Sequence, residues 1–165
     1  MARALPRARS SQEVTRSPWT HVGVVLERGG EPWVLEAAGP VRLTRLDRWR
    51  ARGEGGRTLV RRLPRALSAR ELAALRREGE RYLGRPYDAR FEWSDRRMYC
   101  SELVWKVYQR ALGVRLTEPE RWSALALTPR ATALARRRLG RLPRPSEVVV
   151  TPAALATSPA LVTVR

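Results

Sequence analysis

The stretch WTHVGVVLERGGEPWVLEA, residues 19–37, has the pattern of a β-hairpin. Apolar residues alternate with other residues over Trp19–Leu26, which predicts a half-buried strand. A second strand follows at Trp33–Ala37. Between them, Gly29 and Gly30 suit a type I′ turn, because that turn needs a positive φ at both central positions. The fold should therefore begin with an antiparallel pair of strands.

The register of this hairpin brings two polar residues together. A turn centred on the two glycines pairs His21 with Ala38 and Gly23 with Glu36. Glu36 then shares a sheet face with His21, one diagonal step away and within reach of a long side chain. A slip of one residue would move Glu36 to the opposite face. The proximity of the two side chains thus depends on the turn being centred as predicted.

Helix signals dominate the middle of the chain. Ser68 followed by Glu71 forms the capping-box pattern, which predicts a helix over Ala69–Leu83. Cys100–Leu112 carries an apolar stripe with helical spacing, and Gly113 stands where a C-terminal glycine cap would be. Together with the hairpin, these helices indicate an α+β fold in which an antiparallel, barrel-like sheet packs against helices.

The remaining segments carry weaker signals. Moderately hydrophobic strands are predicted at Val41–Leu43 and Thr58–Leu63. A threonine-proline pair at 128–129 predicts a helix that Gly140 ends. The chain is completed by Glu147–Val150, a short helix that opens at Thr151-Pro152, and Leu161–Val164.

Length and composition limit the architecture. The 165 residues fit one domain, preceded by a polar, proline-containing arm at residues 1–18. A single cysteine and a single histidine exclude an internal disulfide framework and zinc sites with several Cys or His ligands. No apolar run approaches the length of a membrane span, and MARALPRARS lacks the apolar centre of a signal peptide. The default location is cytoplasmic, or the cell envelope if the true start lies upstream.

The net charge of +17 raises the alternative of a non-catalytic protein that binds nucleic acid or an anionic surface. However, Lys106 is the only lysine, so 32 of the 33 basic residues are arginine. Selection for phosphate contacts gives no reason to exclude lysine, whereas the codon usage of a GC-rich genome does. The arginines are also scattered along the chain. A solvated basic surface is the better interpretation, and no specific nucleic-acid partner is expected.

One thiol and one imidazole leave a single possibility for Cys–His catalysis. Cys100 stands at the first turn of its helix, where unpaired N–H groups and the helix dipole stabilise a thiolate. An imidazole from His21 beside it would activate the nucleophile. Glu36 interrupts an apolar strand, where a carboxylate is costly unless it is paired, and it would orient the histidine. The alternatives are that Cys100 fills a gap in the core and that His21 lies on the surface or in the core.

Other polar residues offer less. Asp88, Glu92 and Asp95 share one loop, but no metal-ligand spacing appears, so a solvated polar loop is the better interpretation and no metal or cofactor is expected. Tyr87 and Asp88 precede Cys100 in that loop and either bind substrate or support the structure. The sequence GEGG at 53–56 lacks the context of a phosphate-binding loop.

Four stretches resemble the permuted papain-like cysteine amidases of the YiiX type, circularly permuted relatives of the NlpC-type cell-wall peptidases. These are RSSQEVTRSPWTHVGVVL at 9–26, VLEAAGPVRLTRLDRWRARG at 34–53, YLGRPYDARFEWSDRRMYCSELVWKVY at 82–108 and VVVTPAALATSPALVTV at 148–164. The resemblance spans nearly the whole chain. It implies that His21 is the family's first-strand histidine, Glu36 the acid of the next strand and Cys100 the nucleophile at a helix start.

The resemblance also implies a circularly permuted papain-like fold and hydrolysis of an amide, with a cell-wall-type peptide as one substrate. Lipid esters and thioesters remain alternatives for the same three residues. The family's usual Gly-Asp strand before the RSSQ segment is not part of this sequence.

Overall fold

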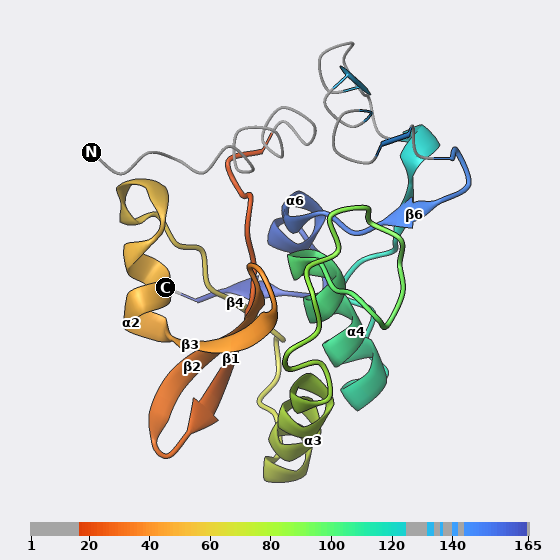
Figure 1. Ribbon diagram of the computed structural model, residues 1–165. Helices are drawn as coiled ribbons and strands as arrows, with labels where there is room; N and C mark the ends of the chain where they lie inside the picture. The colour runs from red at the N-terminus through yellow and green to blue at the C-terminus, as the bar shows by residue number, and fades with distance from the viewer. Residues whose placement is uncertain (1–16, 125–131, 134–135, 137–139, 142–143, 165) are drawn as a thin grey trace.

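The computed structural model describes residues 17–124, 132–133, 136, 140–141 and 144–164 (Figure 1). Strands β1 (Val24–Arg28) and β2 (Glu31–Ala37) form the predicted hairpin. Gly29 and Gly30 have φ values of 62° and 77°, as a type I′ turn requires. Val24 pairs with Leu35, so the predicted register is confirmed. The first strand is shorter than predicted, because residues 19–23 lie outside the ladder.

Strand β3 (Val41–Arg45) extends this sheet on the far side of β2. The other strands are only two residues long: β4 (Arg61–Arg62) pairs with β7 (Val162–Thr163), and β5 (Glu120–Arg121) pairs with β6 (Val148–Val149). All four pairings are antiparallel, and the strands of the described chain form three separate sheets. The α+β class predicted from the sequence is confirmed.

Two helices follow their predicted capping signals. Helix α3 (Ala69–Glu80) begins at a complete capping box between Ser68 and Glu71, and it ends three residues earlier than predicted. Helix α4 (Cys100–Leu112) has the predicted bounds, and Gly113 closes it in the left-handed conformation with a φ of 69°. The glycine cap therefore fixes the C-terminal end of the helix that carries the cysteine.

The remaining helical segments are short. Helix α2 (Leu46–Ala51) follows β3, helix α6 (Pro152–Ala156) begins after Thr151, and two 3₁₀ turns lie at Glu54–Gly56 and Trp122–Ala124. Most of the helix predicted from Thr128-Pro129 to Gly140 and most of the predicted arm at 1–18 lie outside the described residues. No helix in the described part of the chain is long and apolar enough to cross a membrane.

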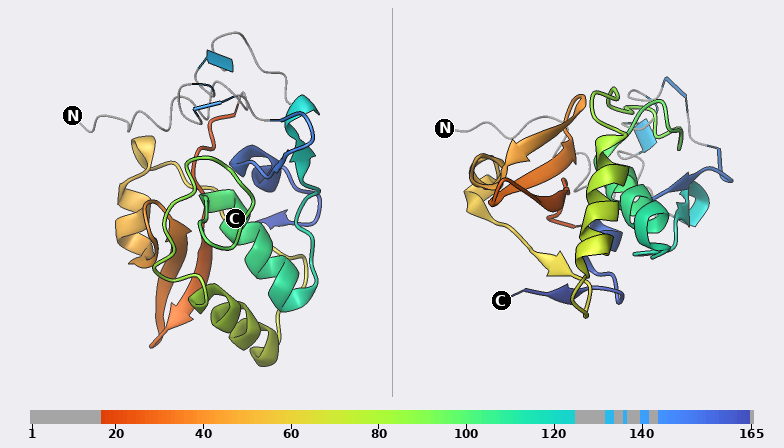
Figure 2. Two further views of the ribbon diagram at one scale, coloured as in Figure 1. Left: turned by 45° about the vertical axis from the view of Figure 1, so that its right-hand side comes forward. Right: turned by 90° about the horizontal axis from the view of Figure 1, so that it is seen from below.

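The three-stranded sheet lies between α2 on one side and α3 with α4 on the other (Figures 1 and 2). Side chains from the sheet and from α3 and α4 share one core, to which Leu26, Leu35, Leu75 and Leu103 belong. Helix α3 approaches β2 closely at Gly79, where an added Cβ would lie 2.5 Å from Leu35 Cδ2. This packing brings the first turn of α4 close to the start of β1, three residues after His21.

Candidate active site

Cys100 is the first residue of α4, and its immediate neighbours hold that end of the helix in place. The Tyr99 hydroxyl accepts a hydrogen bond from the Val150 N–H at 3.2 Å, and the Ser101 hydroxyl donates to the Val150 carbonyl at 2.8 Å. Cys100 itself is a free cysteine with 5% of its surface exposed. The thiol thus lies in a fixed place at the end of the helix where N–H groups lack intrahelical acceptors.

The His21 imidazole contacts both of its predicted partners. Nε2 lies 2.7 Å from Oε2 of Glu36. The ring also hydrogen-bonds to the Cys100 thiol. Because Nε2 faces the carboxylate, Nδ1 is the ring atom left for the sulfur. The imidazole therefore connects a carboxylate on the sheet with a thiol at a helix start.

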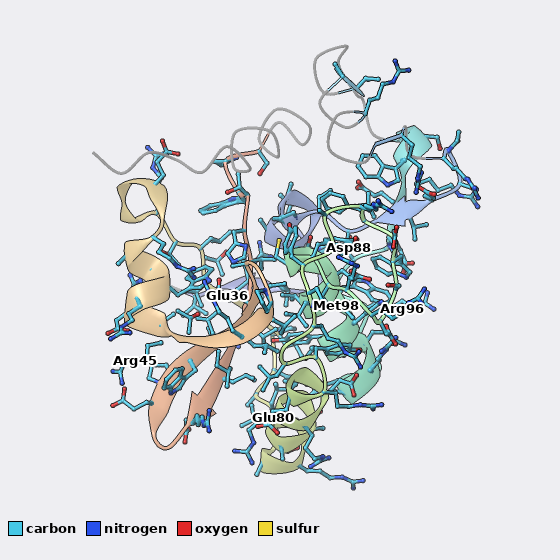
Figure 3. All side chains as sticks on the ribbon, in the orientation of Figure 1. Glu36, Arg45, Glu80, Asp88, Arg96 and Met98 are labelled. Atoms are coloured by element: carbon cyan, nitrogen blue, oxygen red, sulfur yellow. The ribbon has the colours of Figure 1, made fainter. Side chains whose placement is uncertain are left out.

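Glu36, which is labelled in Figure 3, is completely buried. It accepts hydrogen bonds from three further side chains. Its Oε1 accepts from Thr44 Oγ1 at 2.6 Å, from an Arg52 Nη at 2.6 Å and from Arg42 Nε at 3.3 Å. Burial raises the pKa of this carboxyl, but the hydrogen bonds from His21, Thr44 and Arg52 outweigh burial and lower the pKa to about 2. Glu36 is therefore an anion throughout the physiological range.

The thiol and the imidazole shift each other's titration. Burial lowers the pKa of His21, but the contacts with Cys100 and Glu36 raise it overall to about 9. Burial raises the pKa of Cys100, but the hydrogen bond and charge of His21, with the N–H groups of Val22 and Ser101, lower it below its ordinary value. Both shifts favour a thiolate–imidazolium pair at neutral pH.

Close backbone packing supports this arrangement. An added Cβ at Gly23 would lie 2.4 Å from Val34 Cγ1 and 2.7 Å from the Leu35 carbonyl oxygen. Only glycine fits at this position, which explains why a glycine stands two residues after His21. On the other side, the Trp49 ring of α2 lies 6.0 Å from the His21 ring, centroid to centroid. The His21 side chain retains 33% exposure, so the imidazole remains accessible.

The loop between Tyr87 and Met98 leads directly into the cysteine. Asp88 in this loop is completely buried, and its two carboxylate oxygens accept the N–H groups of Arg90 at 2.9 Å and Glu92 at 2.6 Å. The expectation of a solvated loop was wrong for Asp88, because these N–H groups replace water around its carboxylate. Asp88 was predicted either to bind substrate or to support the structure, and these contacts are of the supporting kind.

Tyr87 and Met98 form an isolated bridge at the two ends of this loop. Tyr87 is half-buried and packs against both hydrophobic clusters of the described chain. Met98 is completely buried two residues before the thiol. The loop thereby fixes the approach of the chain to Cys100.

A buried ion pair lies along α4 behind the thiol. Glu102 is completely buried, with Lys106 Nζ 2.8 Å from its Oε1 and the Tyr99 N–H donating to its Oε2 at 3.3 Å. Lys106 also lies 2.9 Å from an oxygen of Asp95. Burial raises the pKa of Glu102 to about 7, against the lowering effect of Lys106. This pair secures the first turn of the helix.

Comparison with known proteins identifies the family. Residues 5–165 match the family described as permuted papain-like amidase enzyme, YaeF/YiiX, C92 family. The chain belongs to this amidase family. A curated relative, uncharacterized protein YiiX of Escherichia coli (strain K12), is 42% identical over 159 residues, which cover 96% of this chain and 79% of the relative.

A solved relative of the same amidase family agrees in three dimensions. The crystal structure of metalloprotein yiiX from Escherichia coli O157:H7 superposes with a TM-score of 0.93 and 40% sequence identity. The match covers 100% of this chain and 92% of that chain. The permuted papain-like fold expected from the resemblance is therefore confirmed.

Several residues around the candidate site were not predicted from the sequence. Arg42 is the cross-strand partner of Glu36, and a second hairpin centred on Gly39 would have indicated it. Arg52 and Trp49 reach the site through the path of the chain around α2, and no sequence signal distinguishes that arginine from the others. Lys106 stands four residues after Glu102, a spacing that favours an ion pair on a helix.

Proposed function

We propose that this protein is a cysteine hydrolase that cleaves an amide by acyl transfer through Cys100, His21 and Glu36. The contact between His21 Nε2 and Glu36 Oε2 at 2.7 Å, on an imidazole that also hydrogen-bonds to Cys100, carries the proposal. A nucleophile, a base and a group that orients the base are the parts that such catalysis needs. Membership in an amidase family supports an amide as the substrate.

In the first half of the reaction, the Cys100 thiolate attacks the carbonyl carbon of the amide and forms a C–S bond. The imidazolium of His21 then gives its proton to the leaving nitrogen as the C–N bond breaks. In the second half, neutral His21 takes a proton from water, which attacks the thioester carbon. The C–S bond breaks, a carboxylic acid leaves, and the thiolate–imidazolium pair is restored.

Negative charge develops on the carbonyl oxygen during each attack. The Cys100 N–H lies in the first helical turn, where backbone N–H groups lack intrahelical acceptors, so it is the donor we assign to this oxyanion. Glu36 keeps the imidazole oriented and stabilises its charged form. Tyr87 and Asp88 remain predicted substrate-binding residues, with the structural role as the alternative.

The relative from Escherichia coli O157:H7 is described as a metalloprotein. In the described part of this chain, no three His, Cys, Asp or Glu side chains form a group that could hold a metal ion. Both oxygens of Glu36 already accept hydrogen bonds from other side chains. The donors described here do not fit such a site, and the proposed mechanism has no step through a metal.

The test is covalent labelling with a panel of activated amide and ester acyl donors, read by intact mass. The wild type should gain one acyl group, and Cys100→Ala should gain none while it unfolds at a similar denaturant concentration. Ser101→Ala is a matched control, because it alters the same helical turn without removing the thiol. Acylation of folded Cys100→Ala would overturn the proposal.

The same panel separates the alternatives. Preference for lipid esters or thioesters over amides would assign the triad to a different substrate class. If no donor acylates the wild type and its affinity for DNA falls steeply with salt, the protein is instead a non-catalytic basic protein.

A further inference from the structure

Two arginines meet at the carboxylate that orients the histidine. Arg42 comes from β3, directly across from Glu36, and Arg52 follows α2. Their side chains are 50% and 43% exposed, although the Glu36 carboxylate between them is completely buried. Each guanidinium therefore contacts the catalytic carboxylate at one end and solvent at the other.

Glu36 does not use the full bonding capacity of these arginines. A carboxylate oxygen offers about two lone pairs, and Thr44 and Arg52 each donate to Oε1 at 2.6 Å. The Arg42 contact with the same oxygen is longer, at 3.3 Å. A guanidinium carries five N–H donors, of which each arginine places one on Glu36. Most of their donors remain available on the exposed side.

The charges at the site do not balance either. Glu36 supplies one negative charge and Arg42 and Arg52 supply two positive charges, while Cys100 and His21 together are neutral whichever of them carries the shared proton.

Some arginines elsewhere in the described chain pair with carboxylates outside the site, such as Arg45 with Glu31 and Arg65 with Glu71. Within the described ranges, the acidic partner of Arg42 and Arg52 is Glu36 alone. The excess positive charge therefore lies beside the imidazole and faces solvent.

We propose that Arg42 and Arg52 bind an anionic oxygen group, a carboxylate or a phosphate, on the substrate that Cys100 attacks. The planar guanidinium presents paired N–H donors that match either group. Because these arginines lie beyond the Glu36 end of the imidazole, the anionic group must be several bonds from the scissile carbonyl. This inference rests on the proposed function and specifies its substrate as an anionic amide.

Three chloroacetamide probes test the inference without an identified substrate. N-chloroacetyl-glycylglycine carries a free carboxylate, its primary amide is neutral, and N-chloroacetyl-aminoethyl phosphate carries a phosphate. In each probe the thiolate forms a C–S bond as chloride leaves. The wild type should react with one or both anionic probes about tenfold faster than with the neutral probe, as expected for charge-assisted hydrogen bonds. The faster of the two identifies the anionic group.

The variants separate anion binding from support of Glu36. In the double variant Arg42→Gln/Arg52→Gln, the ratio of anionic to neutral labelling should fall to about one. If the double variant folds poorly, the single variant Arg42→Gln replaces it. This variant leaves Arg52 on Glu36, and its ratio of anionic to neutral labelling should lie between one and the wild-type ratio. The control Arg48→Gln/Arg50→Gln removes the same charge from exposed positions of α2 and should keep the wild-type ratio.

The contradicting outcomes are distinct. Equal rates for all probes in the wild type, or equal slowing of all probes in the double variant, would overturn the anion site and leave the proposed function intact. Labelling of the wild type by every probe at the rate of an unactivated thiol would overturn the proposed function, and this inference with it.

Discussion

Glu36 on the sheet and Glu102 on α4 are both completely buried, yet their pKa values shift in opposite directions. The pKa of Glu36 falls to about 2, whereas that of Glu102 rises to about 7. Burial raises the pKa in both cases, so the difference comes from the partners. Glu36 accepts from four side chains, three of them cationic, whereas Glu102 has one lysine and one backbone N–H.

The two regions differ because of their surroundings in the fold. β2 lies between two other strands and beside α2, so donors from several segments converge on Glu36. Glu102 is restricted to the first turns of one helix, where Tyr99 and Lys106 are its partners. A charged Glu36 supports the imidazolium of His21, whereas Glu102, with a pKa of about 7, is only partly ionised at neutral pH and has its charge offset by Lys106.

The largest effect on the acylation rate should follow from removing the His21 imidazole, which Glu36 orients. His21→Ala should reduce single-turnover acylation of Cys100 to background. In the triad of subtilisin, loss of the histidine costs about 10⁶ in rate. Stopped-flow measurement with one reactive ester checks this, with thermal unfolding as the control for the fold. Substantial acylation by a folded His21→Ala variant would show that the carboxylate does not act through this imidazole.

Glu36→Gln should have the next largest effect. The amide keeps the shape and one acceptor oxygen but removes the charge that favours imidazolium. Its acylation rate should be below wild type and about 10² above that of His21→Ala, the difference seen between the acid and the histidine of subtilisin. The same ester assay measures both variants. A rate equal to wild type over the whole pH profile would mean that another group orients His21.

Stability should depend on pH in opposite ways at the two glutamates. Glu36, with a pKa lowered from 4.5 to about 2, contributes about 3 kcal/mol that is present above pH 4.5 and lost as the pH falls through 2. Glu102, with a raised pKa, opposes folding increasingly as the pH rises from 4.5 to 7. Urea unfolding between pH 2 and 8 should show each trend weakened in the corresponding Glu→Gln variant. If the stability of the Glu36→Gln and Glu102→Gln variants depended on pH in the same way, the opposite pKa shifts of the two glutamates would be contradicted.

The smallest effect on activity should come from Glu102→Gln. Because Glu102 is only partly ionised at pH 7 and its partners are Lys106 and the Tyr99 N–H rather than His21, the acylation rate should change by less than tenfold. Lys106 keeps its contact with Asp95 in this variant. The ester assay at pH 7 measures the change. A loss as large as that of Glu36→Gln would place Glu102 in the catalytic machinery.

The parts of the fold that local signals determine were predicted correctly. The glycine pair set the register that brings Glu36 to His21. Ser68 and Glu71 set the start of α3, and the apolar stripe together with Gly113 indicated the bounds of α4. These features depend on residues close in sequence. The strand prediction from Trp19 was too long, because alternation of side chains does not show where a chain leaves the ladder to place His21 beside Cys100.

The partners of Glu36 other than His21 were not predicted. Arg42 and Thr44 lie on the neighbouring strand, where a hairpin centred on Gly39 would have indicated them. Arg52 depends on packing between segments farther apart, because it follows α2. In a chain with 32 arginines, none is distinguished by its type alone. The buried Asp88 was misjudged for a related reason, since the backbone N–H groups that solvate it leave no signature in the sequence.

The most direct test of the account is the pH dependence of Cys100 alkylation by iodoacetamide in the wild type and in His21→Ala. If the lowered pKa of the thiol depends on His21, the wild-type rate should rise with a midpoint below the ordinary thiol pKa, so that the wild type reacts faster than His21→Ala near pH 7. In His21→Ala the rate should rise with a midpoint near the ordinary thiol pKa of about 8.5. Coincident profiles with a midpoint near 8.5 in both proteins would contradict the thiolate–imidazolium pair on which the proposed function depends.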